Sequence, residues 1–512
     1  MERKKEIYYF LFLIIFAYLF EKIKCDNSNQ ISDKSYEIHL YFQKNGIQSL
    51  YCDDNILFFG TNNINFYLEE IVDNIFDIGD FDPIMIPRKR KIIKINPVLI
   101  QDSSSLVCKS QIKFNINETF SNSFYIIIEF KNNPKTLKKM FSGSSAYTIE
   151  KFGYPFPLEE SDYSEMFYQC TELVYANLKN LTFENTIDVS SMFSYCKKLE
   201  TIIFPQNSKS SNVESFREMF SHAESLTSID LSGINFLNAK DLSYMFYGCS
   251  NLKTLILPSN EKASNVVDFS YIFYDCRKLT SIDLSNFSFV KTKNLSNMFF
   301  FCSNLENLIL PKNEIVTYVE NISFMFSDCY KLEIIDLSGI SLTNIKDISY
   351  LFSNCTNLES IIFANDEPIN KIEKMSYVFY NCNKLKSIDL SKFNINLVTN
   401  LEYMFDSCSS LETIKLPEQK INNVENFFYI FNNCSKLKII DLTNISFLKA
   451  TNIGFMFANC SNLLEIKFDQ NEKVTNINNM NGTFANCTAI NTIDISHIYI
   501  NNNAILDNLF FN

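Results

Sequence analysis

The feature that most constrains this fold is a segment of 26 or 27 residues that recurs down most of the 512-residue chain. Its marker is a Phe-x-x-Cys core, most often preceded by Met, and the phenylalanine is present in every copy, from Phe167 to Phe484. The cysteine place is held by Cys170, Cys196, Ala223, Cys249, Cys276, Cys302, Cys329, Cys355, Cys382, Cys408, Cys434, Cys460 and Cys487. A unit of this size cannot bury its apolar residues alone, so the copies must stack on one another.

Each copy contains two kinds of apolar spacing. One copy has apolar residues at i, i+3, i+4 and i+7, namely Leu242, Met245, Phe246 and Cys249. This spacing is typical of one face of a helix. The alternating Leu252, Leu255 and Leu257 that follow end at Pro258, which has no amide proton to donate, and they predict a short strand.

Polar residues mark the start of each predicted helix. Eight residues before the cysteine place stand Asp162, Asp188, Ser215, Asp241, Asp268, Asn294, Asn321, Asp347, Lys374, Asn400, Asn426, Asn452 and Asn479. All except Lys374 have a side-chain oxygen that can accept an unpaired amide proton of the first helical turn. The helix start is therefore predicted independently of its apolar face.

The copies alternate between two kinds, so the full period is about 53 residues. One kind ends its strand as Leu-Ile-Leu-Pro and the other as Ile-Asp-Leu-Ser. If the Leu and Ile on either side point inward, the residue between them faces solvent. The outward places are held by Ile203, Asp230, Ile256, Asp283, Ile309, Asp336, Ile362, Asp389, Lys415, Asp441, Lys467 and Asp494. We take those from Asp230 to Asp441 as candidate ligand-binding residues on an exposed sheet face.

Partial copies lie at both ends of the repeats. Met140 and Phe141 begin an incomplete unit before the first full one, and Leu509 and Phe510 hold the Met and Phe places of a further unit. A stack of repeats needs such units to cover its open core. We therefore predict an α/β solenoid over residues 134–512, with a parallel sheet on one face and short helices on the other.

The N-terminus has the pattern of a secretory signal peptide. Arg3, Lys4 and Lys5 precede an apolar run from Ile7 to Phe20, which is short for a membrane span. We predict cleavage near Cys25, with an uncleaved anchor as the alternative. No later stretch is long and apolar enough to cross a bilayer. The mature chain is therefore expected to be secreted or held at the cell surface, without a transmembrane anchor.

Residues 26–133 lack the repeat. They contain alternating β-branched and aromatic runs such as 36–42, 64–68 and 124–130, which predict a small, mostly β N-terminal domain. Cys52 and Cys108 are its two cysteines and, in an oxidising compartment, are candidates for a disulfide.

The repeats resemble BspA-like leucine-rich repeats, specifically the 26-residue type of surface proteins, on the strength of their Leu-x-x-Ile-x-Leu strands and Met-Phe-x-x-Cys cores. The resemblance covers about residues 134–512. It implies a curved α/β solenoid whose parallel sheet forms an extended binding face, in proteins often linked to adhesion. It implies no enzymatic activity and extends to nothing before residue 134.

The repeat cysteines have three possible roles. Zinc sites need clustered ligands, such as Cys-x-x-Cys or added histidines, and one cysteine per turn supplies neither. Disulfides between neighbouring turns are open, although stacked Cβ atoms lie slightly farther apart than a disulfide prefers. The favoured interpretation is a column of small buried apolar side chains, for which Ala223 is an adequate substitute.

Catalysis finds little support in this sequence. His39, His222 and His497 are scattered, and no nucleophile elbow, phosphate loop or zinc-protease motif occurs. A net charge of −12 argues against binding nucleic acid or an anionic membrane. Candidate N-glycosylation sites are Asn117, Asn180, Asn286, Asn294, Asn321 and Asn444.

We therefore expect a monomeric protein without cofactor or metal that binds a protein or glycan on a host, matrix or cell surface through its sheet face. Adhesion is the leading hypothesis. The first alternative is a soluble receptor or inhibitor that captures one ligand. The second is an enzyme with its active site in the N-terminal domain.

Overall fold

The computed structural model describes most of the repeat region and short strands before it. The described residues are 9–10, 36–42, 64–70, 93–94, 98–101, 110–114, 124–130, 137–144, 146–152, 161–205, 212–258, 262–312, 316, 318–364, 369–500 and 504–511. The chain divides into two compact units. The first consists of Met1–Ala239 with Gly248–Glu261, and the second of Lys240–Tyr247 with Lys262–Asn512.

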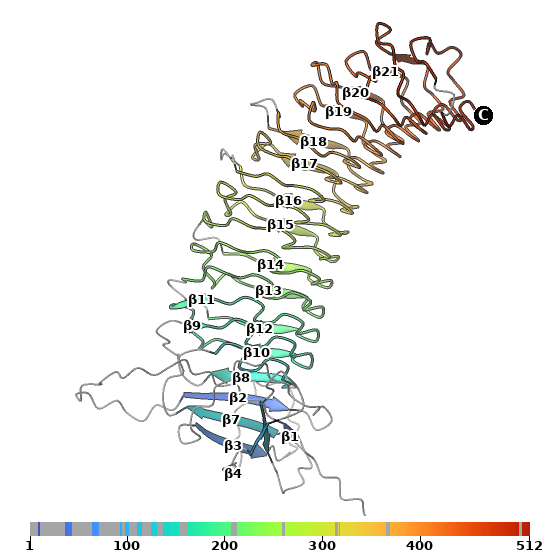
Figure 1. Cartoon of the computed structure of the whole chain (residues 1–512). Helices are drawn as coiled ribbons and strands as arrows, with labels where there is room; N and C mark the ends of the chain where they lie inside the picture. The colour runs from blue at the N-terminus through green and yellow to red at the C-terminus, as the bar shows by residue number, and fades with distance from the viewer. Residues whose placement is uncertain are drawn as a thin grey trace, which may run out of the picture. The chain divides into compact units, whose positions relative to one another are not determined.

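The first unit contains strands β1 to β14. They are β1 (Tyr9–Phe10), β2 (Tyr36–Phe42), β3 (Ile64–Glu70), β4 (Ile93–Lys94), β5 (Val98–Gln101), β6 (Ser110–Phe114), β7 (Phe124–Phe130), β8 (Thr148–Phe152), β9 (Ser161–Asp162), β10 (Tyr175–Asn177), β11 (Thr186–Asp188), β12 (Thr201–Ile203), β13 (Ser228–Asp230) and β14 (Thr254–Ile256). The largest sheet has the order β12-β10-β8-β2-β7-β3-β4. Its β8, β10 and β12 run parallel, and β8 also pairs antiparallel with β2 (Figure 1). The strands before the repeats thus extend the sheet of the first repeats.

Several predictions for the N-terminal part of the chain stay predictions. Strand β1 lies within the predicted signal peptide and pairs antiparallel with β6. The other residues of 1–25 lie outside the described part of the chain, and so do Cys52, Cys108 and Asn117. Signal cleavage, the disulfide and glycosylation at Asn117 therefore remain predictions from the sequence.

The second unit contains strands β15 to β22. They are β15 (Ser281–Asp283), β16 (Asn307–Ile309), β17 (Ile334–Leu337), β18 (Ser360–Phe363), β19 (Ser387–Asp389), β20 (Thr413–Lys415), β21 (Ile439–Asp441) and β22 (Glu465–Lys467). They pair parallel as β15-β16, β17-β18, β19-β20 and β21-β22. Each pair corresponds to one period of two copies, and the strands stack in chain order (Figure 1). The parallel repeat solenoid is confirmed.

The prediction of short helices is wrong for the described residues. The segments before each cysteine are runs of tight turns. In the segment from Phe269 to Cys276, every second amide donates to the next turn of the solenoid, as in Tyr271 N to Ser296 O at 3.0 Å and Phe273 N to Met298 O at 3.0 Å. Of the amides between them, those of Ile272, Tyr274 and Cys276 donate three residues back, as in Cys276 N to Phe273 O at 3.2 Å. The Ser270 amide donates to the Asp268 side chain. An α-helix would need each amide to donate four residues back, so stacking between turns replaces the helix.

The backbone conformation of these segments also excludes a helix. The residues five before and one before the cysteine have positive φ, for example 58° at Tyr271, 61° at Asp275, 59° at Tyr377 and 59° at Asn381. Right-handed helices require negative φ, and positive φ is costly for residues that carry a Cβ. These strained positions are therefore held by the stacking of one turn on the next.

The residues predicted to cap helices start the tight turns instead. The Oδ1 atoms of Asp268 and Asp347 accept the amide two residues ahead, from Ser270 at 2.8 Å and Ser349 at 2.9 Å. In the second unit these starting residues also pair between turns as parallel bridges, such as Asn294 with Asn321. The side-chain acceptor that the sequence indicated is therefore present, but it closes an Asx turn and does not begin a helix.

The phenylalanines form the centre of the core, as the sequence predicted. In the second unit the rings of Phe246, Phe273, Phe299, Phe326, Phe352, Phe379, Phe405, Phe431, Phe457, Phe484 and Phe510 stack one on the next, with centroids 5.2–6.0 Å apart. In the first unit Phe141, Phe167, Phe193 and Phe220 stack in the same way. Each turn therefore contributes one ring to a continuous stack within its unit.

The twelve repeat cysteines are free and buried. Their sulfur atoms lie close to the phenylalanine carbonyl of the preceding turn, for example Cys302 Sγ 3.1 Å from Phe273 O and Cys355 Sγ 3.0 Å from Phe326 O. Burial raises the pKa of both thiols, so they stay protonated and inert at neutral pH. The interpretation as a column of small buried side chains is confirmed for these residues.

We expect the twelve thiols to react with a thiol reagent only after unfolding, because burial both shields them and suppresses the thiolate. The measurement is a thiol count on the folded and on the denatured, unreduced protein. Denaturation should expose at least twelve further thiols per chain. A smaller increase would mean that some of them are oxidised in solution.

Candidate ligand-binding face

The repeat strands expose their first and third residues and turn the second inward. In β15, Ser281 and Asp283 are exposed and Ile282 is buried, and β13, β19 and β21 repeat this pattern. We call the exposed first and third residues of the repeat strands the sheet face of each unit. Because each strand is only three or four residues long, the face has one fixed pair of positions per turn.

The candidate binding residues occupy the third place on these strands. They are aligned in register as Asp230 with Ile256 in the first unit and, in the second, Asp283 with Ile309, Asp336 with Ile362, Asp389 with Lys415 and Asp441 with Lys467. All of these residues are exposed except Asp336, which is half-buried. The outward direction predicted for them agrees with this placement, and their role in binding stays a proposal.

The aspartates of the sheet face also have a structural role that the sequence analysis missed. Their Oδ1 atoms accept the amide two residues ahead, from Ser285 to Asp283 at 2.8 Å, from Ser391 to Asp389 at 2.9 Å and from Thr443 to Asp441 at 3.0 Å. The sequence signal was the Ser or Thr that follows each Asp-Leu, a spacing typical of Asx turns. One carboxylate oxygen thus closes the turn after the strand.

Lysines from neighbouring turns pair with two of these carboxylates. Lys312 Nζ lies 2.7 Å from Asp336 Oδ2, and Lys415 Nζ lies 3.3 Å from Asp389 Oδ2. Burial disfavours the charged form of Asp336, but hydrogen bonds from Lys312 and Ser338 outweigh it and lower the pKa to about 2. Hydrogen bonds from the Ser391 hydroxyl and amide lower the pKa of Asp389.

This pairing predicts that Asp336 makes the protein acid-sensitive. Because its folded pKa is about 2 and its ordinary value is 3.8, the unfolded chain binds the proton more readily. The stabilisation is complete above pH 4 and is lost as pH falls towards 2, and we expect it to be ~1–2 kcal/mol. Denaturant unfolding at pH 4 and pH 2 should show a smaller loss for Asp336→Asn than for the unaltered chain. The matched control is Asp283→Asn, which keeps the turn acceptor and has no lysine partner among the described residues; an equal effect there would contradict the assignment.

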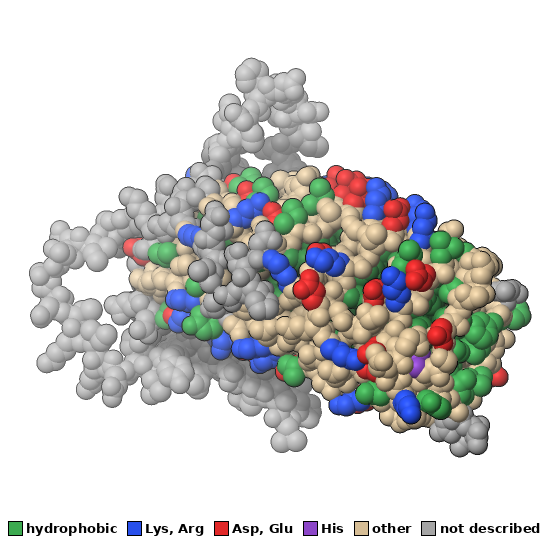
Figure 2. All heavy atoms as spheres, turned by 90° about the horizontal axis from the view of Figure 1, so that it is seen from above, with side chains coloured by type: hydrophobic (Ala, Val, Ile, Leu, Met, Phe, Trp, Pro, Cys, Tyr) green, Lys and Arg blue, Asp and Glu red, His purple; other side chains and the backbone are tan. Residues whose placement is uncertain are grey.

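Charges on other faces are paired between turns. In the second unit Lys346 Nζ lies 2.6 Å from Glu320 Oε2 and Lys420 Nζ lies 2.6 Å from Asp469 Oδ2. Figure 2 shows one face of the molecule, on which basic and acidic side chains lie next to one another. Such exposed pairs contribute little to stability.

The glycosylation candidates differ in exposure. Asn180 and Asn444 are exposed, whereas Asn286, Asn294 and Asn321 are half-buried. The side-chain oxygens of Asn294 and Asn321 accept the amides of Ser296 and Ser323 at 3.1 Å and 2.9 Å. The side chains of Asn294 and Asn321 therefore already form hydrogen bonds within the turns. Asn180 and Asn444 are better placed to carry a glycan.

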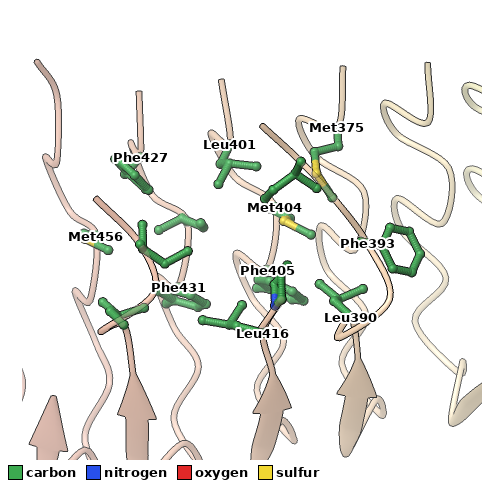
Figure 3. Close-up of a pocket in the computed structure, with 15 residues that line it drawn as sticks. Met375, Leu390, Phe393, Leu401, Met404, Phe405, Leu416, Phe427, Phe431 and Met456 are labelled. Carbon is green, nitrogen blue, oxygen red and sulfur yellow. The ribbon is translucent and has the colours of Figure 1, made fainter. Parts of the chain in front are cut away.

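A cavity of about 20 Å³ lies in the core of the second unit. Figure 3 shows Met404 and Phe405 from a tight-turn segment and Leu390 and Leu416 from the strand side around it. Its lining is entirely apolar, so it offers no polar group to orient a substrate. This cavity is a packing gap rather than a catalytic site.

The described residues contain no cluster of three or more His, Cys, Asp or Glu side chains suited to a metal ion. Within the same residues His497 is buried beside Phe468, and His222 stacks on Tyr195. The described part of the chain also has no helix with the length and hydrophobicity that crossing a membrane would require.

Two family models match the chain. The family described as "Mycoplasma protein of unknown function, DUF285" matches residues 161–281, 365–467 and 438–512, which together cover more than half of the chain. The model described as "BspA type Leucine rich repeat region" matches residues 269–400, which lie between and partly over these segments. No curated protein matches the sequence.

Proposed function

The chain belongs to the family described as Mycoplasma protein of unknown function and carries BspA-type leucine-rich repeats, and we propose that it is a secreted or surface protein that binds other macromolecules through its sheet face. Repeats of this type are typical of surface proteins and of non-enzymatic binding proteins. Adhesion to host, matrix or neighbouring cells is the leading form of this proposal, with a protein or glycan as the ligand.

The observation that carries the proposal is the regular sheet face. Acidic and apolar side chains such as Asp283 and Ile309 are exposed in register on neighbouring strands, held by backbone pairing and by the Asx turns. A partner therefore meets preordered side chains and does not have to order flexible loops, which lowers the entropic cost of binding. Repetition of the same positions suits an extended partner.

The test compares two triple variants of the full chain. Asp283→Asn, Asp336→Asn and Asp389→Asn remove three charges from the sheet face and keep an oxygen that can accept the turn amide. Asp241→Asn, Asp268→Asn and Asp347→Asn make the same change at the turn starts, where the aspartates accept the amide in the same way. Both variants therefore have the same net charge and the same turn chemistry.

We expect the unaltered chain to bind components of an array of extracellular-matrix proteins and glycans, and the sheet-face variant to bind about five- to tenfold more weakly. The turn-start variant should bind as the unaltered chain does. Equal weakening by both triples would contradict the sheet face as the binding site, and binding to no component would contradict adhesion. Binding to a single component would favour the soluble receptor or inhibitor.

A further inference from the structure

Three consecutive strands of the second unit combine exposed apolar and acidic side chains. A glutamate immediately precedes each of β16, β17 and β18, and each of these strands exposes one isoleucine. We call these six residues the acid–apolar patch: Glu306, Glu333, Glu359, Ile309, Ile334 and Ile362. The patch lies on the sheet face and along its edge.

The isoleucines of the patch are unusually exposed for aliphatic side chains. Ile309, Ile334 and Ile362 are 48%, 60% and 47% exposed. In register, Ile362 lies opposite Asp336, and Ile334 begins the same strand as Asp336. Large exposed apolar side chains that lie among polar groups are typical of interaction sites. Covering these side chains would therefore contribute favourably to binding.

The glutamates of the patch are weakly paired. Neither Glu333 nor Glu359 forms an ion pair with any described residue, and Glu306 has only Lys331 Nζ at 3.5 Å. Glu359 N donates to Glu333 O at 2.8 Å, which fixes these two residues side by side. Glu320 of the same unit, by contrast, lies 2.6 Å from Lys346 Nζ. The patch thus retains uncompensated negative charge.

The charge of the sheet face changes on the C-terminal side of the patch. From β20 onward, lysine replaces isoleucine at the third place of alternate strands, at Lys415 and Lys467. Lys415 pairs with Asp389, and Lys467 is in register with Asp441. The lysines therefore offset negative charge on the face beyond β18, where Ile439 of β21 is still 52% exposed.

We propose that the acid–apolar patch binds a basic protein segment with aliphatic side chains next to its lysines or arginines. This inference rests on the proposed function of the sheet face and narrows its partner. The cations would pair with Glu333 and Glu359, and the aliphatic groups would cover Ile309, Ile334 and Ile362. Sulfated glycans and nucleic acids carry the wrong charge, and a neutral glycan offers no cation.

The experiment measures the affinity of the full chain for a synthetic peptide of alternating lysine and leucine. A peptide with glutamine for lysine and one with serine for leucine separate the two contributions. The patch variant is Glu306→Gln, Glu333→Gln and Glu359→Gln. Its matched control, Glu320→Gln, Glu373→Gln and Glu425→Gln, removes the same charge from exposed glutamates nine residues before a cysteine, away from the strands. A third variant, Ile309→Ser, Ile334→Ser and Ile362→Ser, removes the apolar contribution.

We expect the patch variant to raise the Kd about tenfold at low salt and the control triple to raise it less than about twofold. The isoleucine variant should raise the Kd at high salt as well, because apolar contacts are not screened. Equal effects of the two glutamate triples, or no effect of the isoleucine variant, would overturn the proposal and indicate non-specific attraction to a chain of net charge −12. Matrix binding that survives the patch variant but not Asp283→Asn, Asp336→Asn and Asp389→Asn would reject the basic partner and leave the proposed function intact.

Discussion

Replacing Phe352 by alanine is expected to lower the free energy of unfolding by about 3–5 kcal/mol, the range for a large buried aromatic side chain. The ring is fully buried and stacks on Phe326 at 5.8 Å and on Phe379 at 5.6 Å. The substitution opens a cavity in the middle of the stack and removes both ring contacts. Denaturant unfolding of the full chain, followed by circular dichroism, measures the change.

The matched control for this substitution lies in the same repeat. Ile362→Ala shortens an exposed side chain on β18 and is expected to change the stability by less than about 0.5 kcal/mol. If the Phe352→Ala variant does not fold, Phe352→Leu can be measured instead. It keeps most of the side-chain volume and should lower the free energy of unfolding by about 1 kcal/mol. A loss for Phe352→Ala no larger than that for Ile362→Ala would contradict the phenylalanine stack as the centre of the core.

The stacking of the repeats and the inward or outward orientation of their side chains could be predicted from the sequence, because every copy of the repeat shows the same pattern. The phenylalanine place never varies, and the alternation around Asp283 or Ile309 assigns an inward and an outward side by strand geometry alone. The structure places Phe273 inside and Asp283 outside accordingly. Local periodicity is sufficient for these features.

The helices were predicted wrongly because their apolar spacing does not distinguish a helix from stacked tight turns. Phe269, Ile272, Phe273 and Cys276 point to the core in the turns, as they would in a helix. The acceptors that decide between the two are non-local, since the amide of Phe273 donates to Met298 in the next turn. A local signal was present in the Asp, Asn or Gly that often precedes the cysteine, since these residues tolerate positive φ.

The candidate site shows the same division between local and non-local information. That Asp336 faces outward follows from the strand pattern. That Lys312 neutralises it depends on a turn 24 residues earlier in the chain, which the pattern does not specify. The uncompensated charge of Glu333 and Glu359 is likewise visible only when the neighbouring turns are in place. Sequence reasoning located the face, and the structure was needed to find which part of it carries unpaired charge.

Tyr377 gives the sharpest test of the turn conformation. Its φ is 59°, and its ring stacks on Tyr350 at 4.4 Å and on Tyr403 at 4.6 Å. Replacing it by alanine removes both contacts and is expected to cost about 2 kcal/mol. Alanine also keeps the Cβ that makes positive φ unfavourable by ~1–2 kcal/mol, and glycine removes this strain. Glycine loses ~0.5–1 kcal/mol more backbone entropy on folding.

The balance of these two effects makes Tyr377→Gly about 0.5–1 kcal/mol more stable than Tyr377→Ala. In a helix the order would be reversed, because glycine is about 1 kcal/mol worse than alanine there. Gly482 holds the corresponding place of a later copy at φ 58°, so the chain itself uses glycine at this position. The control is the adjacent Ser376, which lacks positive φ. There we expect the ordinary order, in which the alanine variant is more stable than the glycine variant. The measurement is denaturant unfolding of the four variants. If Tyr377→Gly is less stable than Tyr377→Ala, the result would favour a helix here and contradict the stacked turns.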